Sequence, residues 1–173
     1  QPAAGFGKKL AQLLVKVKGP KAKTKLLTAL SVGAFSKSVK NAKTPVDWLS
    51  YNEENVQEFL KDELCGVPFT DAANRDLFTM VSRLHHPFAA KNTSLPILFI
   101  SGEDDPCTGG TLGLVDSIST LQKNGYANIE NITFPKMRHE ILNEKENHLV
   151  IEQIIKFRSM IILLPCILVR LPK

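Results

Sequence analysis

The chain has few cysteines, and their arrangement argues against two common classes of small protein. Only three occur in 173 residues, Cys65, Cys107 and Cys166, and no two of them form a Cys-x-x-Cys pair. A disulfide framework needs several cysteines at regular spacings, and a structural zinc site needs about four closely spaced Cys or His ligands. We therefore expect neither, and we expect reduced thiols in a cytoplasmic protein.

Long apolar runs are also missing. No segment reaches the roughly 20 apolar residues that span a bilayer, and the N-terminus shows no secretion signal. The longest apolar stretch, residues 160–169, is short and contains Pro165. We expect residues 158–173 to be an atypical apolar tail: an added strand, an interface segment, or a stretch unrelated to the fold.

Acidic residues are absent from the first quarter of the chain. Residues 1–43 contain ten lysines and no acid, so this part carries +10, the rest of the chain carries −5, and the net charge is +5. The asymmetry suits an anionic membrane surface or nucleic acid, and it equally suits a solvated lysine face on amphipathic helices. Only Phe6 and Phe35 are interleaved with these lysines, too few aromatic residues for a groove that stacks bases. We expect no nucleic-acid partner and keep the other two alternatives.

The composition, 43% hydrophobic and 23% charged, is that of an ordinary globular protein. Apolar residues spaced by three and four predict helices over residues 6–17, 22–32 and 71–85. Asn52 is expected to cap a further short helix, and Thr70 the helix that starts at residue 71. We predict a helical region over residues 1–92. The side chains expected to be buried in these helices are Leu26, Leu27, Leu30, Val56, Phe59, Leu60, Leu77, Met80, Val81 and Leu84.

The pattern changes after residue 92. Residues 95–100 form a short apolar run between turn residues, which predicts a strand covered on both faces. A helix over residues 112–121 ended by Gly125, a strand over 129–134 and a helix over 149–157 follow. This β-α-β-α order predicts the α/β class, with a parallel sheet over residues 93–157.

Two polar side chains follow the ends of the two predicted strands. Asp105 lies in the turn of residues 102–106, and His139 comes just after the second strand. Because the carboxyl ends of parallel strands share one edge of the sheet, we expect the two side chains to meet. A carboxylate there orients a histidine, binds a metal or simply makes a turn, and His139 alone could be a surface histidine. Taken together they favour the acid and base of an acyl-transfer triad.

Other candidates are weaker. His85 and His86 with Cys65 suggest a metal site, but adjacent helical residues point about 100° apart, so a helix end is the better account. Gly109 and Gly110 at a helix start suit a phosphate or a turn. We expect no metal and no cofactor.

Four segments carry a resemblance to a known family: residues 44–50 (TPVDWLS), 62–66 (DELCG), 102–106 (GEDDP) and 138–144 (RHEILNE). In this order they resemble the α/β-hydrolase family of lysophospholipases and monoacylglycerol lipases, in its bacterial branch, over about residues 6–157. The resemblance implies hydrolysis of carboxylic esters of lipids without metal or organic cofactor. It makes Asp105, three residues after Gly102, the triad acid, with Asp104 as the fallback. It makes His139 the general base and residues 5–90 a helical cap.

The sequence departs from the family in one respect. The nucleophilic serine of this fold lies in a Gly-x-Ser-x-Gly turn before the cap, and no such pentapeptide occurs here. We therefore expect the chain to be the C-terminal portion of such an enzyme, with the nucleophile upstream of Gln1. We expect the chain alone to be inactive and its uncovered strands to favour self-association. A non-catalytic binding or interaction module on the same scaffold is the alternative.

Overall fold

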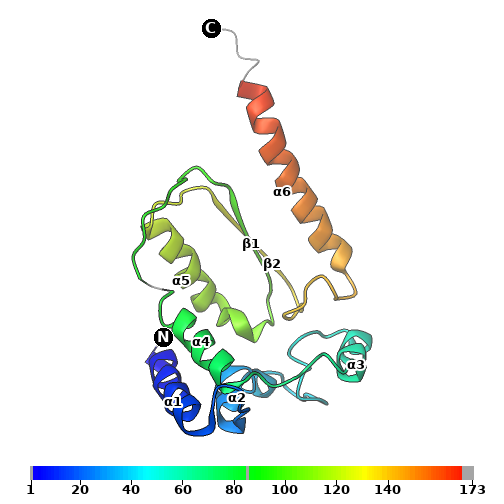
Figure 1. Ribbon diagram of the computed structural model, residues 1–173. Coiled ribbons are helices and arrows are strands. Elements are labelled where there is room, and N and C mark those ends of the chain that lie inside the picture. The colour runs from blue at the N-terminus through cyan, green and yellow to red at the C-terminus, as the bar shows by residue number, and fades with distance from the viewer. Residues whose placement is uncertain (1, 85, 169–173) are drawn as a thin grey trace. The chain divides into compact units, whose positions relative to one another are not determined.

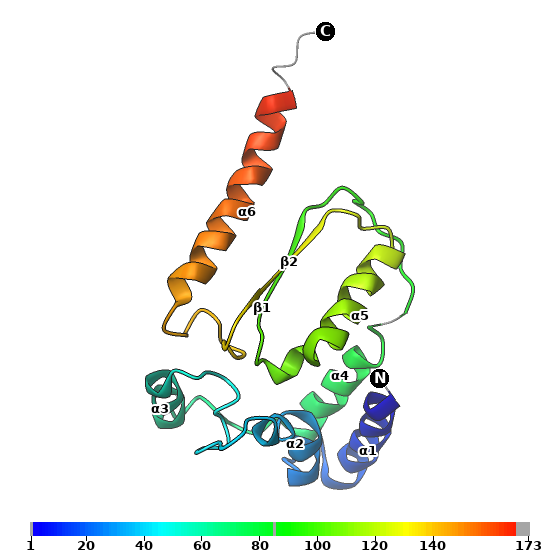
Figure 2. The ribbon, with the colours of Figure 1, turned by 180° about the vertical axis from the view of Figure 1, so that it is seen from behind.

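The computed structural model describes residues 2–84 and 86–168 (Figures 1 and 2). The chain forms two compact units. The first comprises Gln1–Trp48 and Gln57–Phe88, and the second Leu49–Val56 and Ala89–Lys173. The short segment Leu49–Val56 thus belongs with the second unit.

The first unit is helical. It contains α1 (Pro2–Lys18), α2 (Lys25–Ser31), the 3-10 turn η1 (Phe35–Lys37) and α4 (Asp71–Val81), while α3 (Glu53–Lys61) begins in one unit and ends in the other. α1 and α4 lie side by side (Figure 1). Their core consists of Ala11, Leu27 and Phe78, with Leu10 and Leu14 packed against it.

The buried face of α1 is made of small residues. Ala4, Gly7 and Ala11 are buried, whereas Phe6, Leu13 and Val17 are exposed. A Cβ atom at Gly7 would lie 2.9 Å from the ring of Phe78, so the absence of a side chain there lets α4 approach closely.

The helix that follows Thr70 confirms its predicted cap but not its predicted buried face. Thr70 Oγ1 accepts a hydrogen bond from the backbone N–H of Ala73 (3.2 Å), and the helix ends at Val81 rather than near residue 85. Its buried residues are Asp71, Asn74 and Phe78. Five of the side chains that were expected to be buried are exposed: Leu26, Leu30, Leu60, Met80 and Leu84.

A polar contact accounts for the orientation of this helix. The carboxylate of Asp71 accepts hydrogen bonds from the backbone N–H of Thr24 (2.7 Å) and from its hydroxyl (2.8 Å). A buried carboxylate is tolerated when such donors satisfy it. The contact therefore turns the polar start of α4 inward, and Met80 is left on the outside.

The second unit has the predicted β-α-β-α order. β1 (Ile97–Gly102), the 3-10 turn η2 (Pro106–Thr108), α5 (Gly110–Lys123), β2 (Ile129–Phe134) and α6 (Asn147–Leu168) follow one another. β1 and β2 pair in parallel, with Ile97 opposite Ile129 and Gly102 opposite Phe134. Figures 1 and 2 show α5 and α6 on opposite sides of the strand pair.

Burial of this sheet is less complete than expected. Along β1 only Gly102 is fully buried and the other residues are half-buried, because two paired strands leave part of each face open. The core lies instead toward the carboxyl ends of the strands. Phe134, Met137 and Val150 are buried there, and Ile100, Ile132 and Ile141 pack against them.

The closing helix is longer than predicted. It continues to Leu168, so residues 158–168 of the predicted apolar tail are helical and the added strand does not form there. Residues 169–173 of that tail lie outside the described residues. Over the described part of the chain, no helix combines the length and apolar character that crossing a membrane requires.

Candidate active site

The structure brings together the two predicted site residues, Asp105 and His139. Oδ2 of Asp105 lies 3.1 Å from Nδ1 of His139, although the residues are 34 positions apart. Asp105 is 8% exposed, whereas the side chain of His139 is 43% exposed. The fallback residue, Asp104, is exposed. The imidazole therefore has one nitrogen against a buried carboxylate and keeps an accessible surface.

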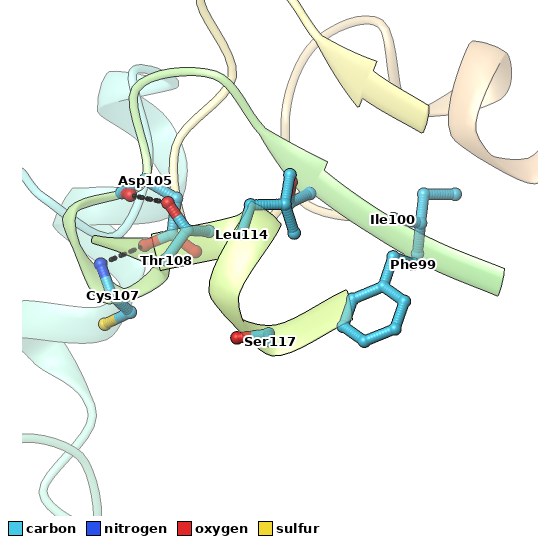
Figure 3. Close-up of a pocket in the computed structure, with 8 residues that line it drawn as sticks. Phe99, Ile100, Asp105, Cys107, Thr108, Leu114 and Ser117 are labelled. Atoms are coloured by element: carbon cyan, nitrogen blue, oxygen red, sulfur yellow. Dashed lines mark hydrogen bonds between the residues drawn. The ribbon is translucent and has the colours of Figure 1, made fainter. Parts of the chain in front are cut away.

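The turn after β1 fixes the orientation of Asp105. Asp105 caps η2, where its Oδ1 accepts a hydrogen bond from the backbone N–H of Cys107 (2.8 Å) and its carbonyl accepts one from Thr108 Oγ1 (2.8 Å) (Figure 3). Pro106 stands at the start of this turn and fixes its backbone. With Oδ1 engaged locally, Oδ2 is the atom that faces His139.

Backbone contacts between the two strand ends place His139 against this turn. The N–H of Glu103 donates to the carbonyl of Phe134 (2.9 Å), and the N–H of Asp104 donates to that of Met137 (2.9 Å). Gly102 lets the two segments meet. A Cβ atom there would lie 2.2 Å from the Met137 carbonyl oxygen and 2.4 Å from that of Arg138.

A buried carboxylate, Glu144, holds the segment after His139. Glu144 is 1% exposed. Its carboxylate accepts hydrogen bonds from the hydroxyl of Ser50 (2.6 Å), from the N–H of Arg138 (2.9 Å) and from the N–H groups of Tyr51 (3.1 Å) and Asn52 (3.2 Å). The carboxylate thus bridges the chain on the N-terminal side of His139 to residues 50–52.

Further bonds join the same two segments. The Arg138 guanidinium donates to the Ser50 carbonyl (3.0 Å), and the N–H of Glu140 donates to the Leu49 carbonyl (2.7 Å). The Glu140 carboxylate accepts from the side-chain amide of Asn55 (2.6 Å). We call Leu49–Asn52 and Arg138–Glu144, with these bonds, the clasp.

Sequence reasoning did not assign a role to Glu144 or Ser50. The available signal was that both lie in the segments that carry the family resemblance, TPVDWLS and RHEILNE. The structure shows why both segments occur together, because they form the two sides of the clasp.

The charge on His139 depends on its neighbours. The hydrogen bond to Asp105, followed by one with the side chain of Cys107, raises the pKa of His139 from 6.5 to about 10, and desolvation opposes the shift only in part. His139 is therefore an imidazolium at neutral pH in this chain. In that state it can donate a proton and cannot accept one.

Cys107 is a site residue that the sequence analysis missed. One donor atom each from Asp105, Cys107 and His139 lies within 4.8 Å of the others, a mixed oxygen, sulfur and nitrogen set of the kind that binds divalent metals. In the structure the imidazole and the carboxylate are hydrogen-bonded to each other. A cation would have to compete with that bond.

Of the other candidate ligands, His85 lies outside the described residues, and among the described ones the group of possible metal ligands does not include His86 or Cys65. Gly109 and Gly110 have φ values of 71° and 68° and form the turn from η2 into α5, where the N–H of Gly110 donates to Thr108 Oγ1 (3.1 Å). A turn into the helix therefore accounts for Gly109 and Gly110 without a bound phosphate.

A cavity of about 270 Å³ adjoins the Asp105 turn, between β1 and α5 (Figure 3). Its apolar lining comes from Phe99, Ile100 and Leu114, and its polar lining includes Asp105 and Cys107. The two site residues of the turn are thus accessible from this side.

A carboxylate after one parallel strand, bonded to an imidazole after the next, is the arrangement that α/β hydrolases use for the last two members of their triad. The fold and this geometry define that class. The chain belongs to the family described as serine aminopeptidase, S33, whose family model matches residues 2–146. The predicted α/β-hydrolase fold and family resemblance are confirmed.

Solved structures show the same fold. A highly thermostable carboxyl esterase from Bacillus coagulans, in complex with glycerol, is similar with a TM-score of 0.80 and 22% identity over 93% of this chain and 53% of that chain. A lipase in an open form is similar with a TM-score of 0.71 and 20% identity, over 88% of this chain and 50% of that chain. A monoacylglycerol lipase from Paleococcus ferrophilus is similar with a TM-score of 0.56 and 18% identity, over 88% of this chain and 52% of that chain.

The chain spans about half the length of each of these structures. A search of curated proteins gives no match.

Proposed function

We propose that this chain supplies the acid, Asp105, and the base, His139, of a serine hydrolase that cleaves carboxylic esters of lipid-like substrates such as monoacylglycerols or lysophospholipids. The observation that carries the proposal is the 3.1 Å contact between His139 Nδ1 and Asp105 Oδ2. The ester-cleaving activities named for the similar structures, a carboxyl esterase and a monoacylglycerol lipase, support the substrate class.

The proposed roles follow from this contact. Asp105 accepts the Nδ1–H of His139 and so fixes the tautomer in which Nε2 carries the lone pair. Nε2 then takes the hydroxyl proton as a serine oxygen bonds to the ester carbonyl carbon. It returns that proton to the leaving alcohol as the carbon–oxygen bond breaks. Water repeats the cycle and releases the acid.

In this proposal the serine comes from sequence outside Gln1–Lys173, since no Gly-x-Ser-x-Gly occurs within it. The raised pKa of His139 agrees with this division. A general base has to be neutral at the working pH, and burial of the half-exposed imidazole by a further segment would favour the neutral form. The chain alone is therefore proposed to be inactive.

We further propose that the first unit forms the cap of the enzyme. This unit carries the lysines of residues 1–43, and α1 presents exposed apolar side chains, among them Phe6, Leu13 and Val17, which suit contact with an acyl chain.

The test compares two polypeptides. The purified 173-residue chain should neither hydrolyse p-nitrophenyl butyrate above the buffer rate nor react with a fluorophosphonate. The polypeptide that also includes the preceding coding sequence should do both, and His139→Gln should abolish both in it. If the longer polypeptide shows no labelling and no turnover, the non-catalytic binding module becomes the better account.

A further inference from the structure

The segment Leu49–Val56 interrupts the helical unit. It belongs to the second unit, whereas its covalent neighbours at the two ends, Trp48 and Gln57, both belong to the first. Within it, Ser50 and Val56 are buried. The chain thus leaves the first unit for a short stretch, makes contacts inside the second and returns. We call Leu49–Val56 the excursion.

The excursion is hydrogen-bonded to the chain on both sides of the proposed base. On the N-terminal side, the guanidinium of Arg138 donates to the Ser50 carbonyl at 3.0 Å. On the C-terminal side, the N–H of Glu140 donates to the Leu49 carbonyl at 2.7 Å, and the side-chain amide of Asn55 donates to the Glu140 carboxylate at 2.6 Å. The residues directly before and after the base are therefore both bonded to the same segment.

A buried hydroxyl adds a third connection. Ser50 Oγ donates to Glu144 Oε2 at 2.6 Å, while Glu144 Oε1 accepts the backbone N–H of Arg138 at 2.9 Å. A buried carboxylate that loses a donor keeps the cost of its desolvation, so the Ser50 hydroxyl stabilises Glu144 in this position. Because Ser50 is uncharged, its hydroxyl can be removed without changing any charge near the imidazole.

These bonds act on a side chain that is itself only partly enclosed. The side chain of His139 is 43% exposed. The backbone on either side of His139 therefore has a large part in keeping Nδ1 at 3.1 Å from Asp105 Oδ2. A displacement of about 1 Å that originates away from the reacting atoms can reduce catalysis by about 10²-fold.

We propose that Ser50 and Asn55 are positioning residues for His139, and that the excursion holds the imidazole against Asp105 through them. Neither side chain is assigned a contact with substrate. Since both ends of the excursion continue into the first unit, the segment that connects two parts of that unit also positions the base. The inference rests on the proposed function only in naming His139 the base.

The test follows the ring of His139 by NMR in the 173-residue chain. Exchange of the Nδ1 proton with water reports how often the bond to Asp105 opens, and nuclear Overhauser effects from the ring to the Asp105 Hβ protons report where the ring lies. We expect exchange to be about tenfold faster in Ser50→Ala and about threefold faster in Asn55→Ala, because each loses one hydrogen bond of the network. Both variants should also weaken the Overhauser effects.

The matched control is Ser159→Ala, which removes an exposed hydroxyl that is bonded within α6 and should change neither readout. Unchanged exchange and Overhauser effects in Ser50→Ala, with β1 and β2 amide signals that show a folded second unit, would overturn the proposal. Should Ser50→Ala fail to fold, Asn55→Ala, at a half-buried side chain, gives the same comparison. Neither readout involves ester hydrolysis, so failure here leaves the proposed function standing.

Discussion

His139 Nδ1 lies 3.1 Å from Asp105 Oδ2, and the contact is made by side chains from the ends of two paired parallel strands. The local sequence around either residue does not create it. It depends on the pairing of β1 with β2, on the close approach at Gly102 and on the clasp that holds the segment around His139. Each dependence can be tested in the chain itself.

The first prediction concerns the charge of His139. Asp105→Asn removes the carboxylate whose hydrogen bond contributes most to the raised pKa, so the pKa of His139 should fall from about 10 toward 6.5. Titration of the ring Hε1 signal by NMR measures this value. Asp104→Asn, at the exposed neighbouring carboxylate, should leave it unchanged. A fall in Asp104→Asn, with none in Asp105→Asn, would show that the wrong carboxylate has been assigned.

The same contact gives stability a defined pH dependence. Because the pKa of His139 is raised on folding, its contribution is fully present below pH 6.5 and is lost as the pH rises through about 10. The difference in free energy of unfolding between the unaltered chain and Asp105→Asn should shrink across this window. Solvent screens a side chain that is 43% exposed, so the effect is small and decreases with salt.

The second prediction concerns Glu144 in the clasp. Glu144→Gln puts an amide where four hydrogen-bond donors converge on a buried carboxylate, and should lower the free energy of unfolding of the second unit by about 2–4 kcal/mol. Urea unfolding followed by the amide signals of β1 and β2 measures the loss. Glu146→Gln, at an exposed carboxylate two residues away, should change it by less than about 0.5 kcal/mol.

If Glu144 also positions His139, the variant should move the pKa of His139 from about 10 toward 6.5 under conditions where the unit is still folded. Unchanged stability in Glu144→Gln would contradict the account of the clasp. Unchanged pKa with reduced stability would restrict the residue to a structural role.

The third prediction concerns Gly102. The Cβ of Gly102→Ala would stand 2.2 Å from the Met137 carbonyl oxygen, so the two strand ends must separate. We expect the free energy of unfolding to fall by about 2–4 kcal/mol. We also expect Asp105 no longer to raise the pKa of His139. Gly5→Ala is the matched control, because nothing lies within 4 Å of the added carbon in α1, where alanine stabilises a helix by up to about 1 kcal/mol. Equal stability of Gly102→Ala and the unaltered chain would argue against the close approach.

The sequence was sufficient to predict the order of elements in the second unit and the meeting of Asp105 with His139. The order of elements follows from the local periodicity of apolar residues, and the meeting follows from the rule that the carboxyl ends of parallel strands share one edge of a sheet. The cap at Thr70 and the end of α5 before Gly125, whose φ is 102°, were predictable for the same reason.

What the sequence left open depends on contacts between distant residues. Asp71 is buried because Thr24, 47 residues earlier, donates hydrogen bonds to its carboxylate. The spacing of apolar residues along a helix does not predict such a contact. Glu144 is buried because it meets Ser50, 94 residues away. The nearness of Cys107 to His139 likewise appears only once β1 and β2 are paired.

The most direct test of the account is the value of kcat/KM for p-nitrophenyl butyrate in the polypeptide that includes the preceding coding sequence. The account predicts a fall of about 10⁴-fold in both Asp105→Asn and His139→Gln, and a change of less than about twofold in Asp104→Asn. An Asp105→Asn variant with nearly the activity of the unaltered polypeptide would contradict it.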